Sequence, residues 1–230
     1  LMAEENFHYY FGGTLDDHPE KANYARYGVP GKRYAWGRFH RRFDINAEPN
    51  EANRFGWIVE VDPLDPASTP VKRTALGRFK HEGAESIVNT DGRLVVYSGD
   101  DQRFEFLYKF VTRGKVSRDD RAANKDLLDE GILYVAKLRD DGTLRWLPLV
   151  HGQAGLDAEN GFASQADTKS NLLDDGLARR HRRKFEWTQG AVSELWNLLL
   201  LSCEIHRVPS SLQPPREFPD EALDPTVLKI

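Results

Sequence analysis

Short runs of β-branched and aromatic residues, separated by turn-forming residues, fill the stretch 54–150 and constrain the fold more than any other feature. The runs cover residues 55–62, 71–82, 86–89, 93–97, 104–111, 132–138 and 144–149. Each is predicted to be a strand, because such side chains fit a pleated, half-buried surface. Asp91-Gly92 and Asp141-Gly142 each lie between two runs. They predict tight hairpins with type I′ turns, in which both central residues have positive φ.

The pattern predicts an antiparallel all-β architecture, and a sandwich, a barrel and a propeller all satisfy it. One face of the run 104–111 is aromatic and is predicted to be core: Phe104, Phe106, Tyr108 and Phe110. The polar stretch 112–131 is predicted to be a long surface connection with one short helix near residues 124–129.

The character of the chain changes at Thr168, where the β pattern stops. Residues 185–206 have apolar positions at helical spacing and are predicted to form a helix, which a Pro-rich end follows. The chain is therefore divided into a β unit, 1–167, and a divergent helical tail, 168–230. A change of reading frame, a truncated gene and a genuinely divergent tail each explain this boundary, and the sequence leaves the three open.

Charge and hydropathy exclude several classes of protein. Asp and Glu number 36 against 32 Lys and Arg, and the net charge of −4 argues against a general nucleic-acid binder. The basic run Arg179–Lys184 can suit an anionic partner, but without interleaved aromatic residues it is better explained as a solvated turn before a helix. There is no apolar run of about 18 residues, so no membrane span is predicted. The first five residues show neither the basic nor the apolar region of an export signal.

The run 71–82 holds the most informative charged residues. In a continuous strand, Arg78, Lys80 and Glu82 would share one face, with neighbours about 6.6 Å apart at a rise of about 3.3 Å per residue. A carboxylate suits a hard metal ion, and the flanking cations suit a phosphate. The alternative is an edge strand with a solvated charged face.

Other candidate groups carry weaker signals. Asp100-Asp101 can supply oxygens to Ca²⁺, but such pairs are common in turns, and a turn is the favoured interpretation. Glu4-Glu5 is a further pair of carboxylates, with a solvated turn as the alternative. The seven histidines show no metal-binding spacing. The single cysteine, Cys203, excludes a disulfide framework and is predicted to be a buried helix residue.

A set of segments is similar to a known family: Asn53–Pro63, Thr69–Glu82, Val95–Asp101, Phe106–Phe110, Asn124–Gly131, Leu133–Ala136, Trp146–Leu149, Glu159–Phe162 and Ser164–Ala166. Through them the stretch 1–167 resembles the PhoX-type bacterial alkaline phosphatases. The resemblance implies part of a larger β-propeller with antiparallel four-stranded blades, in a monomeric enzyme exported by the twin-arginine route to the periplasm or the medium. It also implies calcium and iron as cofactors, small phosphate monoesters as substrates, and neither nucleic acid nor a membrane as partner.

The resemblance extends to candidate site residues. It implies that Glu82 is a metal ligand and that Arg78 or Lys80 holds the substrate phosphate, the residues that the alternation of faces also selects.

The start of the chain resembles the family's Cys-Glu-Glu motif. Glu4 and Glu5 match its two glutamates, one of which would also bind metal. Ala3 stands where the motif has cysteine, and Cys203 lies outside the resemblance, so it is not a counterpart of that ligand.

Two functional hypotheses follow. The first is a portion of a metal-dependent phosphomonoesterase that is incomplete by itself. The alternative is a non-catalytic β-propeller remnant that binds calcium or a partner. About 100–150 residues make two or three four-stranded blades, too few to close a ring of at least four. An open propeller leaves strand edges unpaired, which favours the alternative for the isolated chain.

Overall fold

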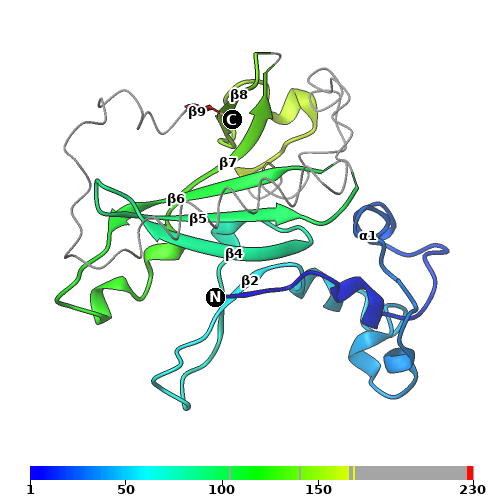
Figure 1. The fold of residues 1–230 in the computed structure, drawn as a ribbon. Coiled ribbons are helices and arrows are strands. Elements are labelled where there is room, and N and C mark those ends of the chain that lie inside the picture. The colour runs from blue at the N-terminus through cyan, green and yellow to red at the C-terminus, as the bar shows by residue number, and fades with distance from the viewer. Residues whose placement is uncertain (104, 140, 166–167, 169–226, 230) are drawn as a thin grey trace.

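The structure is a computed structural model of the chain, and it describes residues 1–103, 105–139, 141–165, 168 and 227–229. This part is mostly β, with two antiparallel sheets (Figure 1). A three-stranded sheet joins, in order, β1 (Met2–Ala3), β2 (Ile58–Glu60) and β3 (Val71–Lys72). A six-stranded sheet joins, in order, β4 (His81–Val88), β5 (Arg93–Asp100), β6 (Leu107–Lys115), β7 (Gly131–Leu138), β8 (Thr143–Pro148) and β9 (Val227–Lys229). The predicted antiparallel β architecture is confirmed.

Helices are few and short in the described part. The α-helix α1 spans Lys21–Tyr27. The 3-10 helices are η1 (Phe7–Tyr10), η2 (Ala35–Arg38), η3 (Arg41–Phe43), η4 (Glu51–Arg54), η5 (Thr74–Leu76), η6 (Ala122–Asn124), η7 (Leu127–Asp129) and η8 (Ala158–Asn160). The short helix expected near residues 124–129 corresponds to η6 and η7. No helix of the described residues has the length and apolar character needed to cross a membrane. The predicted helix 185–206, the basic run 179–184 and Cys203 lie outside the described residues.

Both Asp-Gly pairs lie in hairpin turns, as predicted, but the type I′ prediction was wrong. In the β4–β5 hairpin, the Asn89 carbonyl accepts from Gly92 N at 2.9 Å, and Asn89 N donates to Arg93 O at 2.8 Å. Gly92 has φ +86°, whereas Asp91 has no positive φ. This is a three-residue loop in which a left-handed glycine ends the turn and forms a bulge. The β7–β8 hairpin has the same pair of hydrogen bonds, with Gly142 at φ +78°.

The first half of strand β7 pairs mainly with β6, and its second half pairs with β8. Residues 131–135 pair with β6, and residues 134–138 pair with β8. Only Tyr134 and Val135 pair on both sides, so the sheet consists of a four-stranded part, β4–β7, and a hairpin that continues from it (Figure 1). The expected separate four-stranded blades are not seen as such, because the described sheets have three and six strands and close into no ring.

The run 71–82 is not one strand, which corrects the sequence-based prediction. After β3 the chain winds into η5, and Gly77, at φ +87°, redirects it before β4 begins at His81. The turn is held by Arg73, only 3% exposed, whose guanidinium is 2.6 Å from Glu60 Oε2 and 2.8 Å from Asp129 Oδ1. Alternation of faces requires continuous extended backbone, so it does not apply across this turn.

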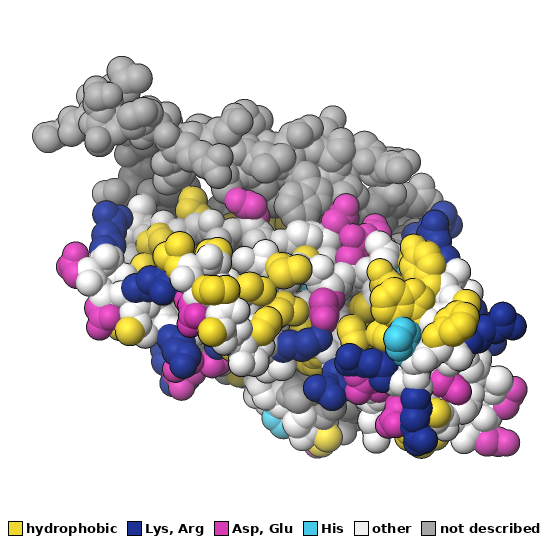
Figure 2. Space-filling model, turned by 90° about the horizontal axis from the view of Figure 1, so that it is seen from below, with side chains coloured by type: hydrophobic (Ala, Val, Ile, Leu, Met, Phe, Trp, Pro, Cys, Tyr) yellow, Lys and Arg dark blue, Asp and Glu magenta, His cyan; other side chains and the backbone are white. Residues whose placement is uncertain are grey.

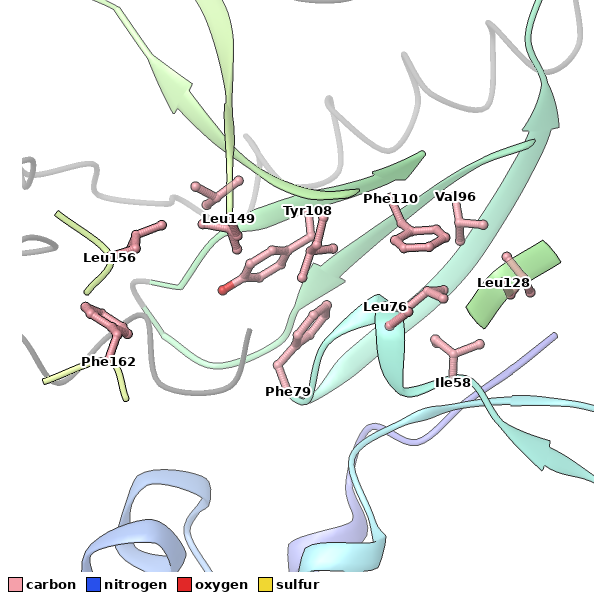
Figure 3. Packing of buried hydrophobic residues seen from close by; sticks show 13 residues of the cluster. Ile58, Leu76, Phe79, Val96, Tyr108, Phe110, Leu128, Leu149, Leu156 and Phe162 are labelled. Carbon is pink, nitrogen blue, oxygen red and sulfur yellow. The ribbon is translucent and has the colours of Figure 1, made fainter. Parts of the chain in front are cut away.

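The main core lies against one face of the sheet β4–β7 (Figure 3). It contains Ile58, Ala75, Leu76, Phe79, Val96, Tyr108, Phe110, Leu128, Leu133, Val135, Leu149, Leu156 and Phe162. These residues come from the sheet itself, from β2, from η5 and the segment that leads from it to β4, from η7, and from residues 149–162. The connections between strands therefore cover the sheet. Tyr108 and Phe110 are buried as predicted and Phe106 packs at the margin, whereas Phe104 lies outside the described residues.

A second, aromatic core forms the N-terminal lobe, which we define as residues 1–55. Its buried residues are Phe7, Phe11, Tyr24, Tyr27, Val29, Phe43, Ile45 and Ala52. Helix α1 ends at Gly28, whose φ of +70° gives the left-handed cap that glycine adopts without a Cβ penalty. The lobe lies beside the six-stranded sheet in Figure 1, and Tyr27 of the lobe donates a hydrogen bond to Arg78 O, just before β4, at 3.1 Å.

Gly131 allows close packing between β6 and β7 and gives a first testable prediction. A Cβ there would lie 2.3 Å from Val111 O and 2.5 Å from Phe110 Cζ. We expect Gly131→Ala to lower the free energy of unfolding by about 1–3 kcal/mol, because strand and ring must both shift. Urea unfolding measures this. Gly12→Ala is the control, since the Cβ added at Gly12 has no neighbour nearer than 3.9 Å. Equal stability of the two variants would contradict the prediction.

Candidate active site

Three segments that are distant in sequence meet where β1 ends, β4 begins and β5 ends. Strand β1 contacts β4 and leads directly into Glu4 and Glu5. Glu82 is the second residue of β4 and pairs with Gly99 of β5, while Asp101 directly follows β5. Antiparallel pairing therefore brings Glu82 and Asp101 to the same end of the sheet, where β1 adds Glu5.

Glu5, Glu82 and Asp101 form what we call the carboxylate cluster. Burial raises the pKa of Glu5 to about 7, together with a hydrogen bond to Asp101 and the negative charges of Asp101 and Glu82. Burial, and then the charge of Asp101, also raise the pKa of Glu82. Like charges this close favour either a shared proton or a bound cation. The cluster is thus a set of oxygen ligands whose mutual repulsion a cation would relieve.

Glu4 lies outside this cluster and ties the β1–β2 sheet together. Its Oε2 accepts hydrogen bonds from the backbone N–H groups of Gly56 and Trp57, both at 3.1 Å. Its Oε1 is 2.6 Å from Lys72 Nζ. Both oxygens therefore have partners within the protein, and of the Glu4-Glu5 pair it is Glu5 that the fold directs to the cluster.

Arg78 is likewise directed away from the cluster. Its side chain is buried, and its guanidinium lies 4.1 Å from the ring centroid of Tyr27. Nε donates to Phe55 O at 2.9 Å and Nη2 donates to Ala52 O at 3.0 Å. Nη1 donates to Asn23 Oδ1 at 3.1 Å. All three nitrogens fasten the N-terminal lobe to the segment before β4, so the geometry favours a structural role for this residue over phosphate binding.

Lys80 does reach the cluster region. Its backbone is fixed against the end of β5, because its N–H donates to Asp100 Oδ1 at 3.3 Å and its carbonyl accepts from Asp101 N at 3.0 Å. Nζ donates to Gln102 Oε1 at 2.5 Å. Burial lowers the pKa of Lys80, which the charges of Asp100, Asp101 and two glutamates, Glu5 among them, partly oppose. Lys80 is therefore a buried cation beside the carboxylate cluster.

His8 also lies in this region, and sequence reasoning missed it. It is 7% exposed, and its Nδ1 has no hydrogen-bond partner among the described residues. Burial and the nearby Lys80 charge lower its pKa to about 4, so the ring is neutral at pH 7. Its position three residues after Glu5 is the one sequence signal that pointed to it.

Arg26 is a second residue that the sequence did not indicate. Its Nε and Nη1 are buried and have no hydrogen-bond partner among the described residues. It lines a narrow cavity together with Lys80 and Asp100. This cavity measures about 10 Å³, which is room for about one water and too little for a phosphate. On the other side of Lys80, Asp101 is the exposed member of the carboxylate cluster.

The sequence of this chain matches that of a known protein family. The family model described as "Alkaline phosphatase PhoX" matches residues 1–196. This chain belongs to the PhoX alkaline phosphatase family. The matched range contains the whole carboxylate cluster, and it extends past residue 167, to which the resemblance in the sequence was assigned.

One solved PhoX structure shows the same relationship. The chain is 49% identical to a Pseudomonas fluorescens PhoX, solved in complex with vanadate, a transition state analogue. The TM-score is 0.66, and the match covers 73% of this chain and 30% of the P. fluorescens chain. This chain therefore spans less than a third of the length of that PhoX. No protein with a curated description matches it.

The donor set of the carboxylate cluster suits a hard metal ion. Glu5, Glu82 and Asp101 offer carboxylate oxygens, which calcium and other hard cations prefer. As they stand, no three His, Cys, Asp or Glu side chains of the described residues are spaced to hold a metal ion. The cluster therefore fits a cation in ligand type and charge but not in spacing.

Proposed function

We propose that this chain carries part of the active site of a metal-dependent enzyme that hydrolyses phosphate monoesters. The observation that carries the proposal is the convergence of Glu5, Glu82 and Asp101 beside Lys80, in a chain 49% identical to a PhoX that binds vanadate. Vanadate adopts the five-coordinate geometry of a phosphoryl group under attack. A site of clustered carboxylates with one adjacent cation suits the same chemistry.

The proposed roles follow from position. Glu5, Glu82 and Asp101 would hold calcium or iron, which when bound supplies the positive charge that neutralises phosphoryl oxygens and activates an oxygen nucleophile. Lys80 lies beside the cluster, and its ammonium would contact a phosphoryl oxygen as a point charge. Arg78 would hold the N-terminal lobe in place, so we assign phosphate contact to Lys80 rather than to Arg78.

We also propose that the described sheets belong to a β-propeller. The four strands β4–β7 run antiparallel in sequence order, which is the arrangement within a propeller blade. The pairing of β7 with β8 through its second half would then mark the passage toward the next blade.

One observation favours the alternative function, a non-catalytic module that binds calcium or a partner. The described residues contain no group of three ligands spaced for a metal. With only these carboxylates as metal ligands, the cluster would bind a cation weakly and would not catalyse hydrolysis of a phosphate monoester.

Hydrolysis of p-nitrophenyl phosphate by the 230-residue chain tests the proposal. We expect turnover that rises when Ca²⁺ and iron are supplied and is lost when a chelator removes them. Terbium luminescence, with Tb³⁺ as a calcium substitute, measures cation binding separately. Binding of Tb³⁺ without any turnover would overturn the catalytic proposal for this chain and support the binding module. Absence of both would overturn the two functions together.

A further inference from the structure

A groove in the N-terminal lobe is separate from the carboxylate cluster and has no role in the proposed reaction. It has a volume of about 520 Å³, which is in the range of small-molecule sites. Its lining residues are Gly12, Gly13, Lys32, Arg33, Tyr34, Ala35, Gly37, Arg38, Asp44 and Asn46. None of them belongs to the cluster or to its neighbours Lys80 and His8.

Three cations of this groove have no carboxylate partner, in contrast to three arginines elsewhere on the lobe. Lys32, Arg33 and Arg38 form no ion pair with any described residue. Elsewhere on the lobe, Arg41 pairs with Glu48, while Arg42 and Arg54 both pair with Glu51. When several surface cations without carboxylate partners surround one groove, they create a local positive potential there. The groove is therefore suited to an anion.

An aromatic surface adjoins these cations. Tyr34 is 42% exposed and lines the groove, and its ring lies 5.1 Å from that of Tyr10, which in turn lies 5.1 Å from Trp36. Figure 2 shows hydrophobic side chains gathered beside Lys and Arg side chains over the N-terminal lobe, at the right of the view. The Arg33 guanidinium lies 5.9 Å from the centre of the Tyr34 ring, so an exposed aromatic ring and a positive charge are found in the same place.

Two glycines that line the groove are close-packed against the rest of the lobe. A Cβ at Gly37 would lie 2.8 Å from Phe43 O, and one at Gly13 would lie 2.6 Å from Asn46 Oδ1. Asn46 is itself fixed by two hydrogen bonds to the backbone of Thr14, at 2.8 and 3.0 Å. Glycine is therefore required at both positions by packing within the lobe, which fixes the backbone that lines the groove.

Asp44 adds one acceptor to an otherwise positive groove. Its Oδ1 accepts from Asn46 N at 3.0 Å, and the second carboxylate oxygen has no hydrogen bond to a described residue. A ligand with only negative charge would be repelled at this point. A ligand that also carries hydroxyl or amino donors would be favoured.

We propose that this groove binds a nucleoside phosphate. The base would stack on Tyr34, the phosphates would contact Lys32, Arg33 and Arg38, and a sugar hydroxyl would donate to Asp44. The lining residues favour a ligand that combines a flat ring, several negative charges and hydrogen-bond donors. The volume fits such a small ligand and excludes a folded macromolecule. The binding needs neither the cluster nor hydrolysis, so it stands apart from the proposed phosphatase function.

Calorimetric titration of the 230-residue chain with three probes tests the inference, in the presence of chelator so that metal-dependent turnover does not interfere. ADP carries both the ring and the charge, pyrophosphate only the charge, and adenosine only the ring. We expect ADP to bind at least about tenfold more tightly than either of the others. Arg38→Gln and Lys32→Gln should each weaken ADP about 3- to 10-fold. Tyr34→Leu should weaken ADP about tenfold and leave pyrophosphate unchanged.

Matched variants on the same lobe distinguish specific binding of ADP in the groove from general electrostatic attraction of ADP to the positively charged surface. Arg41→Gln and Arg54→Gln remove the same charge outside the groove, and Phe39→Leu removes an aromatic ring that is 79% exposed and does not line it. All three should leave ADP affinity unchanged, and thermal melting checks that every variant is folded. Equal binding of pyrophosphate and ADP, equal losses in Arg41→Gln and Arg38→Gln, or no ADP binding at millimolar concentration would each overturn the proposal.

Discussion

Replacement of Arg78 by methionine is expected to lower the free energy of unfolding by about 3 kcal/mol or more. The change leaves the Phe55 carbonyl and Asn23 Oδ1 without their donor, and it removes one of two donors from the Ala52 carbonyl, which still accepts from Phe55 N at 3.1 Å. An unpaired buried acceptor costs about 1–3 kcal/mol. It also removes the guanidinium from the face of Tyr27. Urea unfolding followed by tryptophan fluorescence gives the measurement.

Two further variants decide between a structural and a phosphate-binding role for Arg78. Arg54→Met removes a guanidinium whose side chain is 72% exposed, and we expect little loss of stability there. Arg78→Lys keeps the charge but cannot make three forked hydrogen bonds, so it should also be clearly destabilised. If Arg78→Lys were as stable as the unchanged chain and yet lost activity, the structural assignment would be wrong.

Glu82→Gln is expected to lower kcat/KM for p-nitrophenyl phosphate by about 10²-fold or more. The amide is nearly the same size as the carboxylate, but it carries no charge and is a poor ligand for a hard cation. Removal of one of three clustered carboxylates should also weaken Tb³⁺ binding. Initial rates with Ca²⁺ and iron supplied, together with Tb³⁺ titration, provide the two readouts.

Glu85→Gln is the matched control for this prediction. Glu85 lies three residues further along β4 and pairs with Tyr97, away from Asp101, so its loss should change neither readout. Asp101→Asn should reproduce the effect of Glu82→Gln, because both carboxylates belong to the same cluster. Normal turnover in Glu82→Gln would remove Glu82 from the proposed active site. Equal losses in Glu82→Gln and Glu85→Gln would point to a general effect of charge.

Local chemistry made much of the sheet predictable. The strands from residue 86 onward, the Asp-Gly hairpins and the aromatic core side chains Tyr108 and Phe110 follow from β propensity, turn residues and alternation of faces. The exact turn type was not predictable in this way, because Gly92 alone needs the left-handed conformation when a bulge lengthens the loop. The double pairing of β7 likewise depends on two neighbours that lie on either side of it in space.

The candidate site was only partly visible in the sequence. Glu82, Lys80 and Glu5 reach the site region, but the argument that joined Glu82 to Arg78 assumed a continuous strand, which η5 and Gly77 interrupt. Asp101 was noted as a possible calcium ligand and set aside as a turn residue. Asp101 becomes a candidate only through its proximity to Glu5, which lies about a hundred positions away in the sequence. A local sequence pattern cannot reveal that proximity.

By itself, the sequence determined the antiparallel β character of this chain and, through its similarity to PhoX-type phosphatases, its family, because strand patterns and family motifs are written in neighbouring residues. Only the tertiary structure decided which charged residues lie together. The side chains of Glu4 and Arg78 form hydrogen bonds with backbone groups from other segments. In contrast, the pairing of β4 with β5 and the contact of β1 with β4 bring Glu5, Glu82 and Asp101 to one place. A charged side chain takes its role from the groups that surround it when it is buried, and those groups come from distant parts of the chain.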